Sequence, residues 1–437
     1  IEPGWSKTST FTVKNESKDT YKYNIGIKDL VNTFVTSGYL QYKITSADGG
    51  YNMSDFKDVP KSSAATDTIL AYSVEIAENA THTYIVEFRY QNTTEDQSDD
   101  MGRILSGTLY IEKGTDKPLT LAEKLLEDNP TIQTRSSFSA VFTTTNTGTL
   151  YKATESITGG TAKDVYYFAG EAKNNWVKFG GYYWRIIRTN RDGSVRLLYS
   201  GTSPDTTEGY IGKSKFNSTY SDPISVGYMY GTSGTQASNR TNENNSIIKT
   251  YIDNWYSTNL SSYTKYISTE AVYCNDREVG SGTYTATGSS TFYYAPYTRL
   301  YTNNAPSYNC TSSKDAFSGS NSEAKLTYPI GLMTADEITY AGGYRYTSLT
   351  SPYAWYYLNS AGGSITGSTY WWLLSPLYWD GGVAYLWSVY GSDNPGCLYY
   401  GIVRASFAVR PVISIKSDAL WSSGDGSPEN PYEIVYN

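Results

Sequence analysis

Two short apolar segments that frame residues 371–415 constrain the fold of this chain more than any other feature. The first, YWWLL at 370–374, ends at a Ser-Pro pair, and the second, VRPVISI, spans 409–415. Both have the length and apolar content of buried β-strands. Glycines at 381, 382, 391, 396 and 401 lie between them. The interval is therefore predicted to run as short segments joined by tight turns.

Aromatic side chains fill this interval, whereas charged ones are rare. Ten of the 45 residues from 371 to 415 are aromatic, against 15% for the whole chain. The charged residues are Asp380, Asp393, Arg404 and Arg410. A tyrosine ring contributes apolar area and its hydroxyl forms hydrogen bonds, which suits surfaces that contact a partner. The interval is therefore predicted to be a binding face rather than plain core.

Composition narrows the class of protein. The 437 residues are enough for two or more domains, and 45 tyrosines, 38 glycines and 18% charged residues favour an extracellular, β-rich protein. The net charge of −7, without a cluster of Lys or Arg, argues against nucleic-acid partners. No run of about 18 apolar residues is present, so no membrane-spanning segment is expected. The sequence starts at Ile1 without Met or leader, and we interpret it as a trimmed, monomeric cell-surface chain.

The cysteines and the single histidine limit the possible chemistry. Cys274 and Cys310 flank one loop-rich segment and are expected to pair in an oxidising compartment, which leaves Cys397 as a lone thiol; the alternative is three reduced thiols. His82 lies in the alternating segment THTYIVEF, where a strand surface position is expected. A Ser-His-Asp triad or a zinc site would need more than this one histidine. Neither a catalytic residue, a metal nor a cofactor is predicted.

Residues 1–114 are predicted to form an immunoglobulin-like antiparallel β-sandwich. Period-two alternation recurs in segments such as 21–27, 40–44, 69–76 and 82–90, and clusters of turn residues separate these segments. The opening IEPGWSKTSTFTVKNES resembles the start of bacterial surface β-sandwich domains found in secreted matrix-fibre and pilus-like proteins.

Residues 115–163 are predicted to connect two domains, with the helix at 119–129 either part of the connector or the first helix of the second domain. LTLAEKLLEDN at 119–129 has the pattern of a helix, in which Thr120 and Glu123 form a capping box and Pro130 follows the end. Residues 131–160 are rich in Ser, Thr and Gly and are expected to form a loosely ordered linker.

A second domain of mixed α and β structure is predicted over 164–437. Residues 176–201 have the pattern of a hairpin that turns at Arg191-Asp192-Gly193. Residues 245–260 have the pattern of an amphipathic helix, and Thr334 to Glu337 have the form of a capping box. The overall prediction is a mostly β protein with some α.

Four segments of this domain together resemble a known family. YYFAG with WVKFGGYYWRIIR, LMTADE, YWWLLSP and VRPVISIKSD look like a domain of gut Firmicutes and Mollicutes surface proteins. That domain is similar to the C-type-lectin-like fold of the formylglycine-generating type, which the variable proteins of diversity-generating retroelements use. The resemblance implies an α+β lectin-like fold over 164–437 with a variable region at 377–408. It does not transfer catalysis, because the family's pair of active-site cysteines is absent from that part of the domain.

One property of the sequence agrees with diversification. Retroelement mutagenesis acts on adenines, largely in AAC codons, so it cannot produce Trp, Lys, Glu, Gln or Met. From 371 to 415 there is no Lys, Glu, Gln or Met. The resemblance therefore implies a ligand-binding face whose candidate variable residues are Leu377, Tyr378, Asp380, Gly381, Tyr385, Tyr390, Asp393, Cys397, Tyr399, Tyr400, Arg404, Ala405 and Phe407. The alternative is a Tyr/Gly-rich core segment of biased composition.

Four functions remain open at this point. The first is a surface adhesin or receptor whose partner is a protein or other macromolecule. The second is a carbohydrate-binding module in which exposed Trp379 and Trp387 stack on sugar rings. The third is a pilus or fibre subunit that accepts a neighbour's strand at a sheet edge. The fourth, an enzyme that uses Asp336 and Glu337, is disfavoured, because adjacent helix residues do not face each other.

Overall fold

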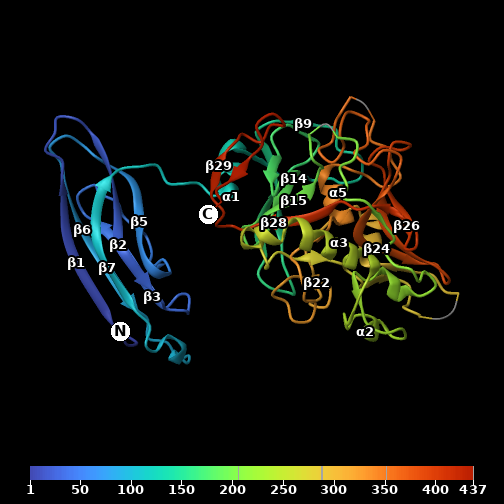
Figure 1. Cartoon of the computed structure of the whole chain (residues 1–437), viewed down its shortest axis with the longest axis horizontal. Coiled ribbons are helices and arrows are strands. Elements are labelled where there is room, and N and C mark those ends of the chain that lie inside the picture. Colours follow the sequence, from blue (N-terminus) through green and yellow to red (C-terminus); the bar gives the residue numbers. More distant parts are fainter. Residues whose placement is uncertain (205, 287–288, 351, 437) are drawn as a thin grey trace. The chain divides into compact units, whose positions relative to one another are not determined.

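The computed structural model describes residues 1–204, 206–286, 289–350 and 352–436. In it, 37% of the residues lie in strands and 12% in helices, and the sheets are largely antiparallel, so the mostly β prediction is confirmed. The chain divides into two compact units, Ile1–Pro118 and Leu119–Asn437 (Figure 1).

Unit 1 consists of two antiparallel sheets around one core. One sheet has the order β1-β6-β3-β4 and the other β5-β2-β7. Buried side chains of both sheets meet between them, among them Ile25 and Ile44. The strands are β1 (Ser6–Lys14), β2 (Tyr21–Asn32), β3 (Leu40–Ser46), β4 (Lys57–Asp58), β5 (Ser62–Ile76), β6 (Thr81–Tyr90) and β7 (Leu105–Lys113).

Two residues of unit 1 show how closely its strands approach one another. Gly107 in β7 approaches β2 so closely that a Cβ would lie 2.4 Å from Cγ2 of Ile27, so only glycine fits without a shift. His82 is buried, with its Nδ1 2.8 Å from the Tyr23 hydroxyl. The prediction that His82 lies on a strand surface is therefore wrong. The alternation of polar and apolar residues correctly predicts the strand, but it does not show which face of the strand packs on the core.

A large sheet forms the centre of unit 2. Its order is β23-β28-β15-β14-β11-β10-β8, and β13 also pairs with β14. The predicted hairpin is present, because β14 and β15 pair on either side of residues 190–194. The strands are β8 (Thr131–Gln133), β10 (Thr149–Glu155), β11 (Lys163–Tyr167), β13 (Trp176–Phe179), β14 (Tyr182–Thr189), β15 (Val195–Tyr199), β23 (Gly331–Leu332) and β28 (Pro411–Ile415).

A second sheet carries most of residues 371–408. Its order is β16-β27-β24-β21-β20, and β25 lies between β24 and β26. The register of β24 with β25 shifts on both sides of Pro376, which has no N–H to donate to the ladder. The strands are β16 (Lys213–Ser214), β20 (Val279–Ser281), β21 (Phe292–Tyr294), β24 (Trp371–Trp379), β25 (Ala384–Val389), β26 (Leu398–Ile402) and β27 (Phe407–Ala408).

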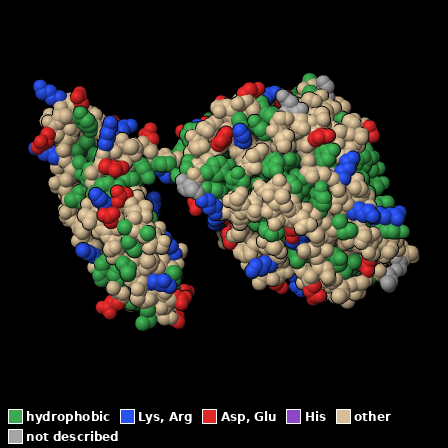
Figure 2. All heavy atoms as spheres, viewed as in Figure 1, with side chains coloured by type: hydrophobic (Ala, Val, Ile, Leu, Met, Phe, Trp, Pro, Cys, Tyr) green, Lys and Arg blue, Asp and Glu red, His purple; other side chains and the backbone are tan. Residues whose placement is uncertain are grey.

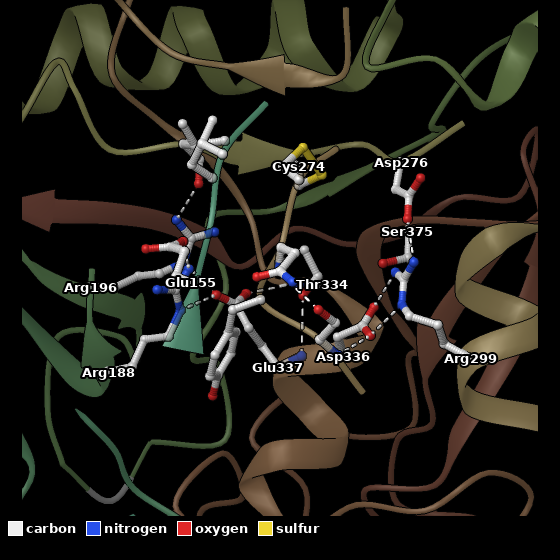
Figure 3. Close-up of a pocket in the computed structure, with 16 residues that line it drawn as sticks. Glu155, Arg188, Arg196, Cys274, Asp276, Arg299, Thr334, Asp336, Glu337 and Ser375 are labelled. Atoms are coloured by element: carbon white, nitrogen blue, oxygen red, sulfur yellow. Dashed lines mark hydrogen bonds and ion pairs between the residues drawn. A yellow bond between two sulfur atoms is a disulfide. The ribbon is translucent and has the colours of Figure 1, made fainter. Parts of the chain in front are cut away.

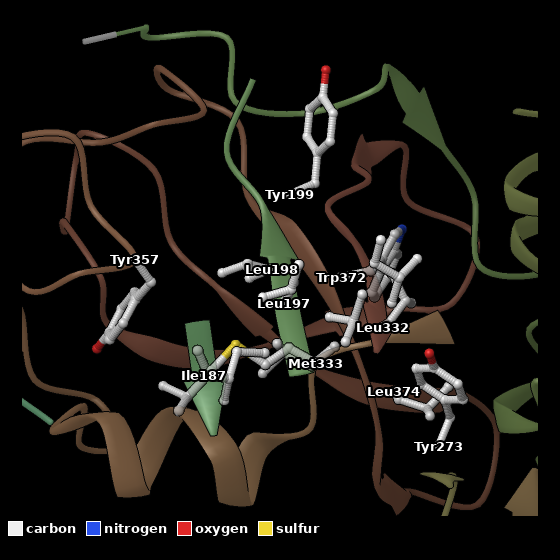
Figure 4. Close-up of a cluster of buried hydrophobic side chains, with 14 of the residues drawn as sticks. Ile187, Leu197, Leu198, Tyr199, Tyr273, Leu332, Met333, Tyr357, Trp372 and Leu374 are labelled. Carbon is white, nitrogen blue, oxygen red and sulfur yellow. The ribbon is translucent and has the colours of Figure 1, made fainter. Parts of the chain in front are cut away.

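The two sheets of unit 2 share one core (Figure 4). Leu197 and Leu198 of β15 pack with Leu332 and Met333 and with Trp372 of β24, all fully buried. This core holds β24 rigidly, and β25 and β26 continue the sheet outward from it. Smaller two-stranded pairs complete the unit: β9 (Thr145–Asn146) with β12 (Glu171–Ala172), β17 (Met229–Tyr230) with β18 (Asn244–Asn245), β19 (Tyr273–Cys274) with β22 (Ala316–Phe317), and β29 (Trp421–Ser423) with β30 (Glu433–Ile434).

Helices cover the sheets of unit 2 and begin where the sequence indicated. Thr120 and Thr334 both form capping boxes, with Glu123 and Glu337 respectively. Tyr256 and two isoleucines form the buried face of α3. The helices are α1 (Leu121–Asp128), α2 (Gln236–Asn239), α3 (Ile247–Asn259), α4 (Ala295–Tyr297), continued by the π-helical turn η4 (Thr298–Thr302), and α5 (Ala335–Ala341).

Residues 119–163 belong to unit 2, contrary to the predicted connector over 115–163. β10 pairs in parallel with β8 and antiparallel with β11 inside the large sheet, and Leu150 and Tyr151 are buried. The high Ser and Thr content was misleading, because β-branched threonine fits a strand as well as a loop. The boundary also lies a few residues later than predicted, at Pro118.

Candidate functional site

A row of tyrosines crosses the second sheet of unit 2. In the strand register, Tyr293 of β21 lies opposite Tyr378 of β24, and Tyr378 lies opposite Tyr385 of β25. The rings of Tyr378 and Tyr385 stack with centroids 4.4 Å apart, and those of Tyr293 and Tyr378 are 5.8 Å apart. Directly opposed aromatic pairs stabilise neighbouring strands. All three side chains are half-buried, so the row remains partly accessible.

The row continues onto β26 and beyond. Tyr400 lies 5.6 Å from Tyr385 by ring centroids and stacks on Tyr399 at 4.3 Å. Tyr399 contacts Tyr390 at 4.8 Å, and Tyr390 contacts Tyr370 at 3.8 Å. The rings thus form a continuous chain across neighbouring strands.

A second row of tyrosines comes from the segment that sequence reasoning missed. Tyr293 stacks on Tyr297 at 4.2 Å, and Tyr297 stacks on Tyr301 at 4.7 Å with an angle of 12° between the rings. The spacing of four residues, which places side chains on one helical face, was visible in the sequence. Tyr346 joins the two rows of tyrosines, because its ring contacts both Tyr301 and Tyr399.

We call these ten residues the tyrosine cluster: Tyr293, Tyr297, Tyr301, Tyr346, Tyr370, Tyr378, Tyr385, Tyr390, Tyr399 and Tyr400. Tyr301 and Tyr346 are its most exposed members, with 40% and 43% of their surface accessible. The other eight are half-buried. Three separate segments of the chain (293–301, 346 and 370–400) therefore build one aromatic surface.

Tyr346 adopts a backbone conformation that tyrosine rarely takes. Its φ angle is 53°, in the left-handed region that disfavours residues with a side chain. The backbone N–H of Tyr346 donates to the carbonyl of Leu398 (2.9 Å), and Leu349 N–H donates to that of Pro395 (2.7 Å). The guanidinium of Arg345 lies 4.7 Å from the Tyr301 ring. These contacts hold the exposed ring of Tyr346 against its neighbours.

Several phenols of the cluster have a pKa above the ordinary value of tyrosine. Burial raises the pKa of Tyr346, Tyr378 and Tyr385, and adjacent phenols raise the first two further. A hydrogen bond with Tyr400, followed by burial, raises the pKa of Tyr399 to about 12. The surface therefore offers apolar ring edges and phenolic hydroxyl groups to a partner.

Three of the thirteen candidate residues do not lie on an adaptable surface. Leu377 is fully buried, and Cys397 is a buried free cysteine whose thiol pKa is raised by burial to about 11. Gly381 has φ 93°, and a Cβ there would lie 2.5 Å from the backbone of Ser289. The irregular register around Pro376 and the close contact with residue 289, remote in sequence, explain why the sequence did not show these constraints.

The other ten candidates are at least partly accessible, but they do not form one patch. Tyr378, Tyr385, Tyr390, Tyr399 and Tyr400 belong to the tyrosine cluster. Phe407 adjoins it through Tyr370, at a centroid distance of 4.9 Å. Asp380 caps the turn that follows β24 and accepts a hydrogen bond from the Tyr385 hydroxyl (3.2 Å), and Asp393 is exposed. Arg404 lies 3.9 Å above the ring of Tyr220 rather than among the cluster, and Ala405 packs on the core.

Trp379 and Trp387 are buried, with 2% and 0% of their surface exposed. A tryptophan that stacks on a sugar needs a free ring face in contact with solvent. The expectation that these two rings are exposed for stacking on sugars is therefore wrong. Figure 2 shows acidic and basic side chains scattered over the visible face of unit 2, without a large patch of one sign.

Asp336 and Glu337 lie in a buried ion-pair network instead of an open cleft (Figure 3). Glu337 Oε1 contacts Nε of Arg188 (3.1 Å) and Nε of Arg196 (2.6 Å), and Asp336 binds Arg299. Burial alone would raise the pKa of Glu337, but the two guanidinium groups hold it below its ordinary value. The cavity here has about 20 Å³ of free volume, room for roughly one water molecule.

The network joins segments that are distant in the sequence. Cys274 and Cys310, which line the same cavity, form a disulfide with Cα atoms 5.7 Å apart, the pairing that the sequence analysis expected. Arg188 also binds Glu155 of β10 (2.9 Å). Across the described ranges, no group of three or more His, Cys, Asp or Glu side chains is placed to hold a metal ion.

No family model, curated protein or solved structure matches the chain. Within the part of the chain that the structure describes, none of the helices combines the length and the apolar character that a membrane crossing requires.

Proposed function

We propose that this protein is a bacterial cell-surface adhesin or receptor and that the tyrosine cluster of unit 2 contacts a macromolecular ligand. The observation that carries this proposal is the convergence of ten partly or fully accessible tyrosines, from three segments, on one surface supported by a shared core. Tyrosine-rich faces bind partners through rigid rings with little loss of side-chain freedom. Unit 1, an immunoglobulin-like sandwich in this proposal, acts as the stalk.

A protein ligand fits this surface better than a sugar. The rings of Tyr297 and Tyr301, and those of Tyr399 and Tyr400, stack on each other, so much of their ring faces is already covered. The accessible parts are ring edges and hydroxyls. Hydroxyl groups both donate and accept hydrogen bonds, which matches the peptide groups and polar side chains of a protein surface.

We also propose that unit 2 is a lectin-like variable domain of the retroelement type. Five of the accessible candidate residues lie within the tyrosine cluster, whereas Trp379 and Trp387, which adenine mutagenesis cannot produce, are buried. The remaining cluster residues, including Tyr301 and Tyr346, lie outside 377–408 and would be constant.

Adhesion of coated microspheres tests the binding function. Microspheres that carry the full chain are applied to cultured epithelial cells under flow, and the retained fraction is counted. Replacing Tyr385, Tyr399 and Tyr400 by serine is expected to reduce retention at least tenfold. The matched control replaces Tyr21, Tyr166 and Tyr230, which lie outside the cluster, and is expected to leave retention unchanged. Equal loss in both variants would contradict the proposal.

Sequencing of the locus in many isolates tests diversification separately. Substitutions are expected to concentrate at Tyr378, Tyr385, Tyr390, Tyr399 and Tyr400 and to spare Leu377, Gly381 and Cys397. An even spread over 119–437 would refute the retroelement assignment while leaving the binding function intact.

A further inference from the structure

Unit 1 contains a large open groove that the proposed function does not use. Its free volume is about 740 Å³. Residues of β1 such as Thr10 and Phe11 line one side, and residues 105–111 of β7 line the other. A volume of this size is in the range of sites that bind ligands.

The two strands that border the groove are the edges of the two sheets. β1 is the last strand of one sheet, paired with β6, and β7 is the last strand of the other, paired with β2. Among the described residues, neither strand has a second partner in the sheets. Each edge therefore presents a row of backbone N–H and C=O groups that another strand can pair with.

The floor of the groove is part of the core of unit 1. Ile27 and Leu30, almost fully buried, line it together with the half-buried Phe88, Leu105 and Leu109. The groove thus gives access to the space between the sheets, and an inserted side chain would extend the existing core. Burying apolar surface in this way is favourable by roughly 25 cal/mol per Å².

The scarcity of charged side chains in the groove lining limits which segments can bind there. Of the 17 residues that line the groove, Lys7 is the one that carries a charged side chain. A charged residue inserted between the sheets, away from the exposed Lys7, would lie without a counterion, which is costly. The lining stretches, 7–12 of β1 and 105–111 of β7, match a strand of about six or seven residues, on the order of 20 Å long.

We propose that this groove binds an extended β-strand supplied by another polypeptide chain. The strand pairs its backbone with the free edges of β1 and β7, and its alternate apolar side chains enter between the sheets. Along the inserted length it is uncharged. This interaction is separate from the tyrosine cluster and gives unit 1 a binding role of its own.

A synthetic peptide tests the proposal on the full chain. The probe carries the sequence Lys-Lys-Gly-Thr-Val-Thr-Val-Thr-Val-Gly-Lys-Lys and a fluorescent label, and its anisotropy is followed during titration with protein. Saturable binding is expected, and amide hydrogen exchange in β1 and β7 should slow at least fivefold in the complex. A peptide with Asp in place of the three valines is expected not to bind.

Two variants and a control locate the site. Leu109→Lys places a charge in the groove, and Thr108→Lys does so at an exposed position of the lining, where folding is not threatened. Both should weaken binding at least tenfold. Ile85→Lys, on β6 at a position 49% exposed and outside the lining, should bind as the parent does. Absence of saturable binding, or equal weakening by Ile85→Lys, would overturn the proposal.

Discussion

Single residues decide which positions of 377–408 can accept a different side chain. Tyr399 and Tyr400 contact other rings at the surface, so a changed side chain there meets solvent as well as protein. Gly381 and Cys397, in contrast, are fixed by backbone geometry and by burial. The sequence alone makes all four residues candidates for variation. Only their surroundings in the structure show which of them can change.

Gly381→Ala is expected to destabilise unit 2 by more than about 1 kcal/mol, because alanine at positive φ is strained and its Cβ would collide with the Ser289 backbone. Gly382→Ala is the matched control: the nearest atom that its Cβ would meet is Oδ1 of Asp380, 3.8 Å away. Thermal unfolding of the two variants measures the difference. Equal melting temperatures would show that the turn after β24 tolerates side chains at both positions.

The thiol of Cys397 is expected to be unreactive in the folded protein. It is buried, and burial raises its pKa to about 11, so little thiolate exists at pH 8. Ellman's reagent should therefore detect no thiol in the native chain and a single thiol per chain in guanidinium chloride with the disulfide intact. Rapid reaction of the native protein would place Cys397 at the surface after all.

At the scale of elements, the helix starts were the most predictable features and the aromatic surface the least. The capping boxes at Thr120 and Thr334 are local patterns, so the sequence alone identifies them. The hairpin of β14 and β15 is equally local. The meeting of Tyr301 and Tyr399 through Tyr346 depends on the packing of segments about a hundred residues apart, which no short pattern encodes.

Glu337→Gln in α5 is expected to cost about 3 kcal/mol of unfolding free energy, because it removes the carboxylate that pairs with the buried guanidinium of Arg196 and leaves Arg188 with Glu155 alone. Glu123→Gln in α1 is the control, since that residue has the same place in a capping box. It should cost less than about 1 kcal/mol. Chemical denaturation of both variants gives the comparison.

Glu337 is also expected to make the stability of unit 2 depend on pH. The pKa of folded Glu337 lies below its ordinary value of 4.5, so its contribution to stability is complete above that pH and is lost as the pH falls below it. The parent should therefore lose stability more steeply than Glu337→Gln below about pH 4.5. Parallel curves for the two proteins would show that the carboxylate is not held in its charged form by the arginines.

At the scale of the whole molecule, the sequence indicated two domains and a mostly β fold, but placed the connector wrongly. Alternation in 1–114 defined unit 1 well, because most of its strands have one face on the core. Residues 131–160 were predicted as a linker, because their Ser- and Thr-rich composition does not by itself indicate strands. In the structure, pairing with strands elsewhere in the chain, such as β11, stabilises them. Pro118 marks the actual division.

The two units are expected to unfold in two separate thermal transitions, because each has its own hydrophobic core. Replacing both Cys274 and Cys310 by alanine should lower only one transition, that of unit 2, since the disulfide closes a loop within that unit. Differential scanning calorimetry of the parent and the double variant is the measurement. A shift of both transitions would mean that the units are thermodynamically coupled.

The tyrosine cluster includes Tyr301 and Tyr346, which lie outside 377–408, and this has a consequence for how ligand recognition could evolve. In the proposed variable domain, changes confined to 377–408 would exchange only part of the contact area, while the tyrosines at 293–301 and 346 would stay in place. Under that proposal each new version inherits a baseline attraction for protein surfaces, and the altered residues need only shift the preference among partners.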